Sequence, residues 1–232
     1  MTELVLPPLF HDEPASGSAM EHAQMRAMQG CDAGLLAHHI GSDAIDAALV
    51  FAPEIPLAKA MAMFPLCGIG FQNALGALAP PEVAVHLEWN GGLRINGAKC
   101  GSFSAACSHS GPDEIPDWLA VGFTLPLWPK SDRPGDTPDE TALYAEGCAD
   151  VQAPALVEAW ARHTLGWIGR WEDEGNKPLH TEWRGLVHGV GEPANHAKAS
   201  GTFLGVDEDF GMLLRDESTT HLIPLTALLE SS

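Results

Sequence analysis

Positively charged side chains are scarce in this sequence. Its 232 residues include 12 lysines and arginines against 31 aspartates and glutamates, which gives a formal net charge of −19 and a pI of about 4.7. Proteins that bind nucleic acids or anionic membrane surfaces need a basic face to pair with phosphates. We therefore expect neither nucleic acid nor membrane as a partner, whereas the acidic surface favours solubility or a basic partner.

Targeting signals and disulfide patterns are also absent. No run reaches the ~18 consecutive apolar residues of a membrane span. The first eight residues, Met-Thr-Glu-Leu-Val-Leu-Pro-Pro, lack the basic start and the long apolar core of a signal peptide. The five cysteines form no Cys-x-x-Cys pair and are odd in number, which is typical of a reducing compartment. We therefore expect a cytoplasmic protein.

Several signatures of catalysis or cofactor binding are incomplete. The glycines within 68–76 do not have the spacing of a dinucleotide-binding loop. Cys107 and His109 could ligate zinc, but no paired-ligand spacing accompanies them. A nearby serine with His109 and Asp113 would suggest a hydrolase, but Gly-x-Ser-x-Gly is absent. None of these patterns predicts a site, and we assign no metal ligand.

The stretch 83–102 carries the most specific local signal. An apolar run at 83–87 enters a glycine turn at 90–92, and a short alternating segment then reaches Asn96-Gly97. Asn-Gly between two extended runs predicts a hairpin, because a type I′ turn needs positive φ at both central residues. Lys99 follows this turn, and small residues from Gly101 onward leave room for a group that approaches the backbone.

The rest of the chain predicts an α+β domain over residues 1–180 and a small β module over 181–232. Helical patterns, the first with a Ser18–Glu21 capping box, cover 18–29, 56–78 and 154–173. Apolar segments typical of buried strands cover 35–39, 47–52 and 118–125. Short strands separated by turns are predicted at 185–190, 201–206, 211–215 and 220–224. The boundary is expected near 178–184.

The predicted hairpin resembles the central motif of biotin protein ligases, which reads roughly Lys-Trp-Pro-Asn-Asp, a turn, and Lys-x-Gly-Gly. Trp89 and the run Asn96-Gly97-Ala98-Lys99-Cys100-Gly101 carry the match. The order of elements along nearly the whole chain is similar as well. This resemblance implies a mixed sheet with helices, shared with lipoate ligases and related to class II aminoacyl-tRNA synthetases. It also implies a C-terminal SH3-like β-barrel.

The same resemblance implies an activity. Biotin, lipoate or a related carboxylate would react with ATP and Mg²⁺ to form an acyl-adenylate. The acyl group would then pass to a lysine of a biotinyl or lipoyl carrier domain, and a homodimer is a further expected assembly. Lys99 would stabilise the negative charge that develops on the α-phosphate. The residues expected to bind substrate are Trp89, Asn90 and Gly91 on the nucleotide side, Gly101 and Ser102 in the ligand floor, and Asn96, Gly97, His39 and Arg94.

The sequence departs from the ligase pattern in its cations. The ligases have a Gly-Arg-Gly-Arg-Arg-Gly loop where this chain has residues 39–46 without an arginine, and Lys59 is the only lysine or arginine between Arg26 and Arg94. Glu88 replaces a lysine and would repel phosphates. The alternative to a ligase is therefore a non-catalytic protein that binds a small carboxylate or a protein partner on the same scaffold.

Overall fold

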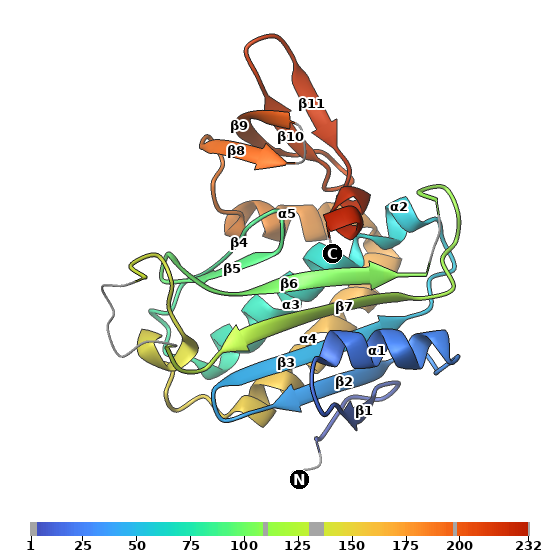
Figure 1. Ribbon diagram of the computed structural model, residues 1–232, viewed down its shortest axis with the longest axis vertical. Helices are drawn as coiled ribbons and strands as arrows, with labels where there is room; N and C mark the ends of the chain where they lie inside the picture. Colours follow the sequence, from blue (N-terminus) through green and yellow to red (C-terminus); the bar gives the residue numbers. More distant parts are fainter. Residues whose placement is uncertain (1–3, 109–110, 130–136, 197–198, 232) are drawn as a thin grey trace.

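Two β-sheets organise the molecule (Figure 1). The computed structural model describes residues 4–108, 111–129, 137–196 and 199–231. The larger sheet has seven strands in the order β1-β2-β3-β7-β6-β5-β4, with β1 parallel to β2 and the other neighbours antiparallel. Its strands are β1 His11–Pro14, β2 Leu35–Ile40, β3 Ala44–Phe51, β4 Val85–Leu87, β5 Gly92–Ile95, β6 Ala98–Cys107 and β7 Leu119–Pro126.

The second sheet is small and antiparallel, with the order β11-β10-β9-β8. Its strands are β8 Pro193–His196, β9 Ala199–Val206, β10 Met212–Arg215 and β11 Thr220–Ile223, and the 3-10 helix η2 Leu225–Ser231 follows. The last three strands confirm the sequence prediction, and the sheet fits an SH3-like module. The strand predicted at 185–190 is wrong, because residues up to Leu186 end a helix, and β8 lies in a segment predicted as a turn.

The helices are α1 Ala19–Met28, α2 Leu57–Ala60, α3 Met63–Leu78, α4 Ala153–Glu174 and α5 Asn176–Leu186, with the 3-10 helix η1 Leu143–Glu146. The capping box of α1 is confirmed, because the Ser18 hydroxyl accepts a hydrogen bond from the Glu21 N–H at 3.3 Å. The helix predicted over 56–78 is divided between α2 and α3. Sequence analysis did not predict α5, and the expected domain boundary falls inside it.

The two faces of the large sheet are covered unequally (Figure 1). Helices α3 and α4 pack on one face, where Phe123 of β7 meets the buried Trp160 of α4 edge to face at 4.9 Å between ring centroids. On the other face α1 packs small side chains against β2, β3 and β7, with Ala23 of α1 over Ala37 and Ala48. Strand β6 exposes Ser102 and Ser104 on that second face. This surface is therefore accessible.

Helix α3 lies in the centre of the core. The stretch Leu57–Leu78 is apolar and long enough to cross a membrane by composition alone, but 72% of its most apolar window is buried. Small residues such as Gly68, Gly70 and Gly76 in this helix suit close packing on a sheet. Instead, Gly70 faces α4, since a Cβ there would lie 2.6 Å from the Thr164 hydroxyl oxygen, whereas Gly68 does face Leu87 of β4. The close approach that glycine permits is mainly between two helices.

Candidate functional site

The predicted hairpin is confirmed as a type I′ turn between β5 and β6. Asn96 has a φ of 51° and Gly97 a φ of 91°. The Asn96 amide fixes the turn from both sides, because its oxygen accepts from the Ala84 N–H at 3.0 Å and its nitrogen donates to a Glu146 carboxylate oxygen at 2.8 Å. Asn96 and Gly97 therefore shape the turn that positions Lys99.

The register of the strands places four of the ten predicted site residues on one surface: His39, Arg94, Lys99 and Ser102. Residues directly opposite each other in antiparallel strands point to the same face of the sheet. One row across the sheet is His86, Arg94 and Lys99. The next row is Gly92, Ser102, Thr124, Asp46 and His39. We call this surface the open face, and its exposed side chains are His39, Lys99, Ser102, Ser104 and Thr124.

Lys99 has a fixed backbone and a free charge. Its N–H donates to the Asp139 carbonyl and its carbonyl accepts from the Thr141 N–H, both at 2.8 Å. The side chain is exposed, and its ammonium makes no hydrogen bond or ion pair with the described part of the chain. Lys99 can therefore supply one positive charge to a ligand on the open face.

Arg94, by contrast, already has an anionic partner. Its Nε donates to Glu88 Oε1 at 2.5 Å and its Nη1 donates to the Gly97 carbonyl at 2.7 Å. Only 16% of the Arg94 side chain and 20% of the Glu88 side chain are exposed. A Cβ at position 92 would lie 2.4 Å from Glu88 Oε2, so Gly92 leaves the space that this carboxylate occupies.

Asp46, Thr124 and His39 form what we call the polar floor of the open face, which lies between Lys99 and the first turn of α1. Asp46 accepts from the Ala19 N–H at 2.9 Å and from the Thr124 hydroxyl at 3.4 Å. Burial raises the pKa of Asp46, and the two hydrogen bonds oppose this shift only in part. His39 Nδ1 lies 3.1 Å from the Ala15 carbonyl oxygen, and the imidazole is exposed. The polar floor therefore presents a carboxyl group, a hydroxyl group and an imidazole to a ligand on the open face.

The turn between β2 and β3 does not add a cation to this floor. Gly41 closes the turn with an N–H that donates to the Ala44 carbonyl at 2.9 Å, and Asp43 brings a further carboxylate. At the other side of the floor, Gly101 has a φ of 102°, and a Cβ there would lie 2.2 Å from the Thr124 carbonyl oxygen. The group that approaches this glycine most closely is thus the backbone of β7.

Trp89 and Gly91 point away from the open face. Trp89 is 4% exposed, and its indole N–H donates to the Phe210 carbonyl at 2.8 Å. Gly91 is buried against β6, where a Cβ would lie 2.4 Å from the Phe103 carbonyl oxygen. Asn90 is exposed and caps its own turn, with its side-chain oxygen accepting from the Gly92 N–H at 3.2 Å.

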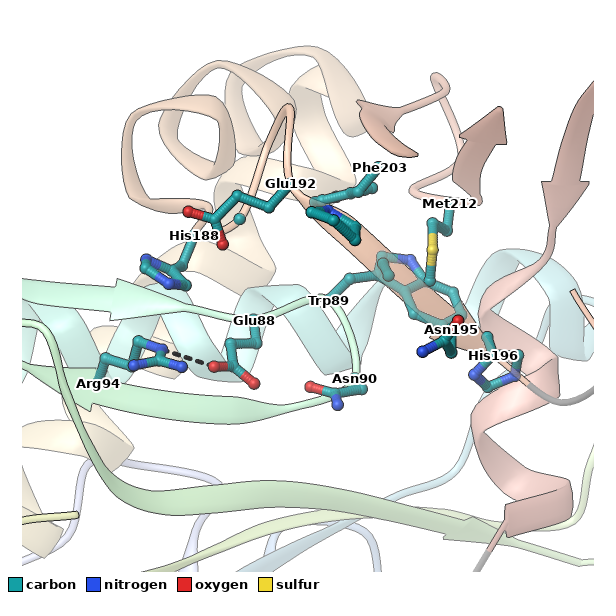
Figure 2. A pocket seen from close by; sticks show the side chains of 13 residues that line it. Glu88, Trp89, Asn90, Arg94, His188, Glu192, Asn195, His196, Phe203 and Met212 are labelled. Atoms are coloured by element: carbon teal, nitrogen blue, oxygen red, sulfur yellow. Dashed lines mark hydrogen bonds and ion pairs between the residues drawn. The ribbon is translucent and has the colours of Figure 1, made fainter. Parts of the chain in front are cut away.

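A cavity of about 250 Å³ lies between the turn after β4 and the second sheet. Figure 2 shows the Glu88–Arg94 pair on the side of the large sheet, with His188 and Glu192 across from it. The His188 N–H donates to the Leu87 carbonyl at 2.8 Å. Sequence analysis missed His188 and Glu192, because they lie in the segment that was assigned to the β module. Their sequence carried no signal that placed them beside Glu88.

The described residues form no metal site, and the cationic side chains that they place beside the β5–β6 turn are Lys99 and Arg94. Among the parts of the chain that the structure describes, no group of three histidine, cysteine or acidic side chains could hold a metal ion. Binding a magnesium triphosphate requires several convergent cations. Lys99 has a free charge, but Glu88 neutralises Arg94 beside it. The zinc and hydrolase alternatives depend on His109, which lies outside the described residues.

Residues 6–185 match the model of the Biotin/lipoate A/B protein ligase family, and residues 190–231 match a Domain of unknown function (DUF4444). This chain is similar to a biotin protein ligase-like protein of unknown function from Silicibacter sp. TM1040, whose crystal structure is known and whose sequence is 63% identical. Its TM-score is 0.92, and the match covers 97% of this chain and 99% of that one.

Two biotin protein ligases share the fold at much lower identity. The enzyme from Aquifex aeolicus in complex with biotin and ATP is 15% identical, with a TM-score of 0.69 and coverage of 97% of this chain and 96% of that one. The enzyme from Leishmania major in complex with biotinyl-5-AMP is 16% identical, with a TM-score of 0.55 and coverage of 94% and 99%. A comparison with curated protein sequences finds no match.

Proposed function

Because this chain belongs to the biotin/lipoate A/B protein ligase family, we propose that its open face binds a small carboxylate of the biotin or lipoate type. The observation that carries this proposal is the ammonium of Lys99, which has no partner among the described residues and lies at the edge of a polar floor. A single ammonium matches a single carboxylate, and a charge-assisted hydrogen bond between them is about twice as strong as a neutral one. Ser102 and Thr124 offer hydroxyls along the same face.

Binding without nucleotide turnover is the function that the geometry supports best. The Aquifex aeolicus relative forms a complex with both biotin and ATP. In this chain Arg94 is paired with Glu88, and the β2–β3 turn carries Asp43 where the ligase motif has arginines. These charges support a monoanion on the open face and oppose a triphosphate. The protein would act in the cytoplasm, where its five cysteines, all free, stay reduced.

The second candidate is a ligase that forms an acyl-adenylate and transfers the acyl group to a lysine of a biotinyl or lipoyl carrier domain. Membership of the family and the lysine at position 99 of the matched motif favour it. The two candidates differ in a measurable way. The ligase requires ATP and releases pyrophosphate, whereas the binding protein responds to the carboxylate alone.

The test compares wild type, Lys99→Ala and Lys177→Ala. Lys177 is an exposed lysine on α5 and serves as a matched control for the loss of one charge. We expect biotin, lipoate or octanoate to raise the unfolding temperature of wild type and of Lys177→Ala, because a ligand that binds only the native state stabilises it. Lys99→Ala should bind that carboxylate at least about tenfold more weakly by calorimetry.

Each of the other results points to a different conclusion. If none of the three carboxylates binds wild type, the proposed function is wrong. Release of pyrophosphate from ATP that depends on both the carboxylate and Lys99 would establish the second candidate instead. Equal weakening by both lysine variants would show that net charge, and not the position of Lys99, controls binding.

A further inference from the structure

We propose that Glu88 determines the charge of the ligand that the open face accepts, because its carboxylate occupies the anion position of Arg94 and so excludes phosphate-bearing ligands. The inference deepens the proposed function, since it concerns the selectivity of the same surface. It rests on the Glu88–Arg94 pair and on the position of that pair beside Lys99.

The first step is that the Glu88 carboxylate binds a guanidinium whose position is fixed by the turn. Arg94 Nε donates to Glu88 Oε1, and the Gly97 carbonyl holds Arg94 Nη1, so the guanidinium is fixed by two partners. The pair is mostly withdrawn from water, and such pairs are screened by salt less than exposed ones. Gly92 provides the matching space, because any side chain there would meet the Glu88 carboxylate.

The second step is that Arg94 and Lys99 are direct neighbours. They are opposite each other in the β5–β6 ladder, and residues so paired have Cβ atoms about 5 Å apart. A guanidinium and an ammonium on side chains that are paired in this way would together suit a phosphate, which accepts charge-assisted hydrogen bonds from both. With Glu88 in place, the three side chains carry one net positive charge, which suits a monocarboxylate.

The third step is that the same pair closes one wall of the 250 Å³ cavity. Figure 2 shows Arg94 joined to Glu88 at this wall, and Glu192 adds a second carboxylate on the opposite side. A phosphate group at this wall would therefore meet the Glu88 carboxylate that is bound to Arg94, whereas Glu192 faces it only from across the cavity. An uncharged part of a carboxylate ligand would not be opposed in this way.

The experiment measures binding of pyrophosphate, without metal, to wild type, Glu88→Gln and Glu192→Gln at low salt. Glutamine keeps an oxygen that can accept from Arg94 Nε but removes the charge. We expect Glu88→Gln to bind pyrophosphate about tenfold or more tightly than wild type, since the positive charge of Arg94 is then no longer neutralised by a carboxylate. Glu192→Gln changes the net charge equally but has no bond to Arg94 in the described structure, so it should gain little.

Two further variants keep the test decisive. Adding Arg94→Gln to Glu88→Gln should return pyrophosphate binding to the weak wild-type level, and Glu88→Ala should replace Glu88→Gln if the latter fails to fold. Unchanged pyrophosphate binding in the folded Glu88 variants, or an equal gain in Glu192→Gln, would overturn the proposal. A pyrophosphate gain in a protein that binds none of the carboxylates would support it and refute the proposed function, so the two failures are distinguishable.

Discussion

Glu13 shows how strongly a single charge partner can act in this acidic chain. Arg26 of α1 donates from Nε to Glu13 Oε2 at 2.7 Å and from Nη2 to Glu13 Oε1 at 2.8 Å, and His22 adds a contact at 3.0 Å. The hydrogen bonds from Arg26 hold the pKa of Glu13 at about 2, well below the ordinary 4.5. The pair ties α1 to the edge strand β1.

Glu13→Gln should therefore destabilise the protein in a pH-dependent way. Because the folded pKa is depressed, the stabilisation is present above about pH 4.5 and is lost as the pH falls toward 2. We expect Glu13→Gln to lower the free energy of unfolding by on the order of 1 kcal/mol at pH 7. Urea unfolding at pH 7 and pH 2.5 measures the difference, and a difference that is equal at both values would contradict this account.

At the scale of residues, sequence reasoning succeeds where the cause is local. The type I′ turn at Asn96 and Gly97 was predictable, because positive φ depends on those two residue types. The burial of Trp89 was not predictable, because its partner Phe210 is 121 positions away in the chain. The Glu88–Arg94 pair spans only six positions, but it depends on the geometry of the turn between β4 and β5, which no sequence pattern fixed. Strand β6 has a bulge between Lys99 and Ser102, which shifts its pairing with β5 by one residue. No pattern in the sequence locates this bulge.

At the scale of elements, the contact between α3 and α4 gives a matched pair of substitutions. A Cβ at Gly70 would lie 2.6 Å from Thr164 Oγ1 and 3.1 Å from its backbone nitrogen, whereas one at Gly76 would meet only Gln72 Nε2 at 3.8 Å. Gly70→Ala should cost about 1–3 kcal/mol by overpacking. Gly76→Ala in the same helix should stabilise by about 0.5–1 kcal/mol, because alanine loses less backbone entropy on folding.

Chemical denaturation of the two glycine variants tests this prediction. A stable Gly70→Ala would mean that the two helices can separate without loss of packing. The two glycine-to-alanine substitutions are expected to change the free energy of unfolding in opposite directions. Comparing them therefore separates the effect of packing from the effect of helix propensity.

Elements with strong periodicity or a cap were predictable from sequence, and elements without them were not. Helix α4 was found from tryptophans at helical spacing, and Trp160 and Trp167 are indeed core residues. Strand β1 has no apolar alternation, because it is an edge strand that only pairs with β2. Helix α5 contains Pro178 and Gly185, which argue against a helix, although Leu179 and Trp183 are spaced for one and Pro178 lies in the tolerated first turn.

At the scale of the whole molecule, Trp89 joins the two sheets. Its buried indole donates to the Phe210 carbonyl, whereas the Lys59–Asp209 pair, which links α2 to the same β9–β10 connection, is about half exposed. Trp89→Phe should cost about 1–2 kcal/mol, because it leaves a buried carbonyl without its donor. Lys59→Ala should cost less than about 1 kcal/mol, as exposed ion pairs do.

Limited proteolysis with mass spectrometry, alongside urea unfolding, measures the attachment of the second sheet in these variants. Trp89→Phe should release fragments from the chain after Leu186 sooner than wild type or Lys59→Ala. Because Trp89 points away from the open face, binding at Lys99 should persist in this variant. A larger effect of Lys59→Ala would show that the exposed pair, and not the indole, attaches the sheet.

The pairing of β3 with β7 also sets an order for folding. The hairpin β2–β3 and the run β4 to β7 join near neighbours in sequence, whereas Phe51 pairs with Leu119, 68 positions later. Closing that long loop is the entropically costly step. On the ribosome, the apolar helix α3 emerges between the two halves and stays partly uncovered until α4, its main packing partner, arrives. A nascent chain of this protein therefore needs the help of chaperones most during the synthesis of residues 63–174.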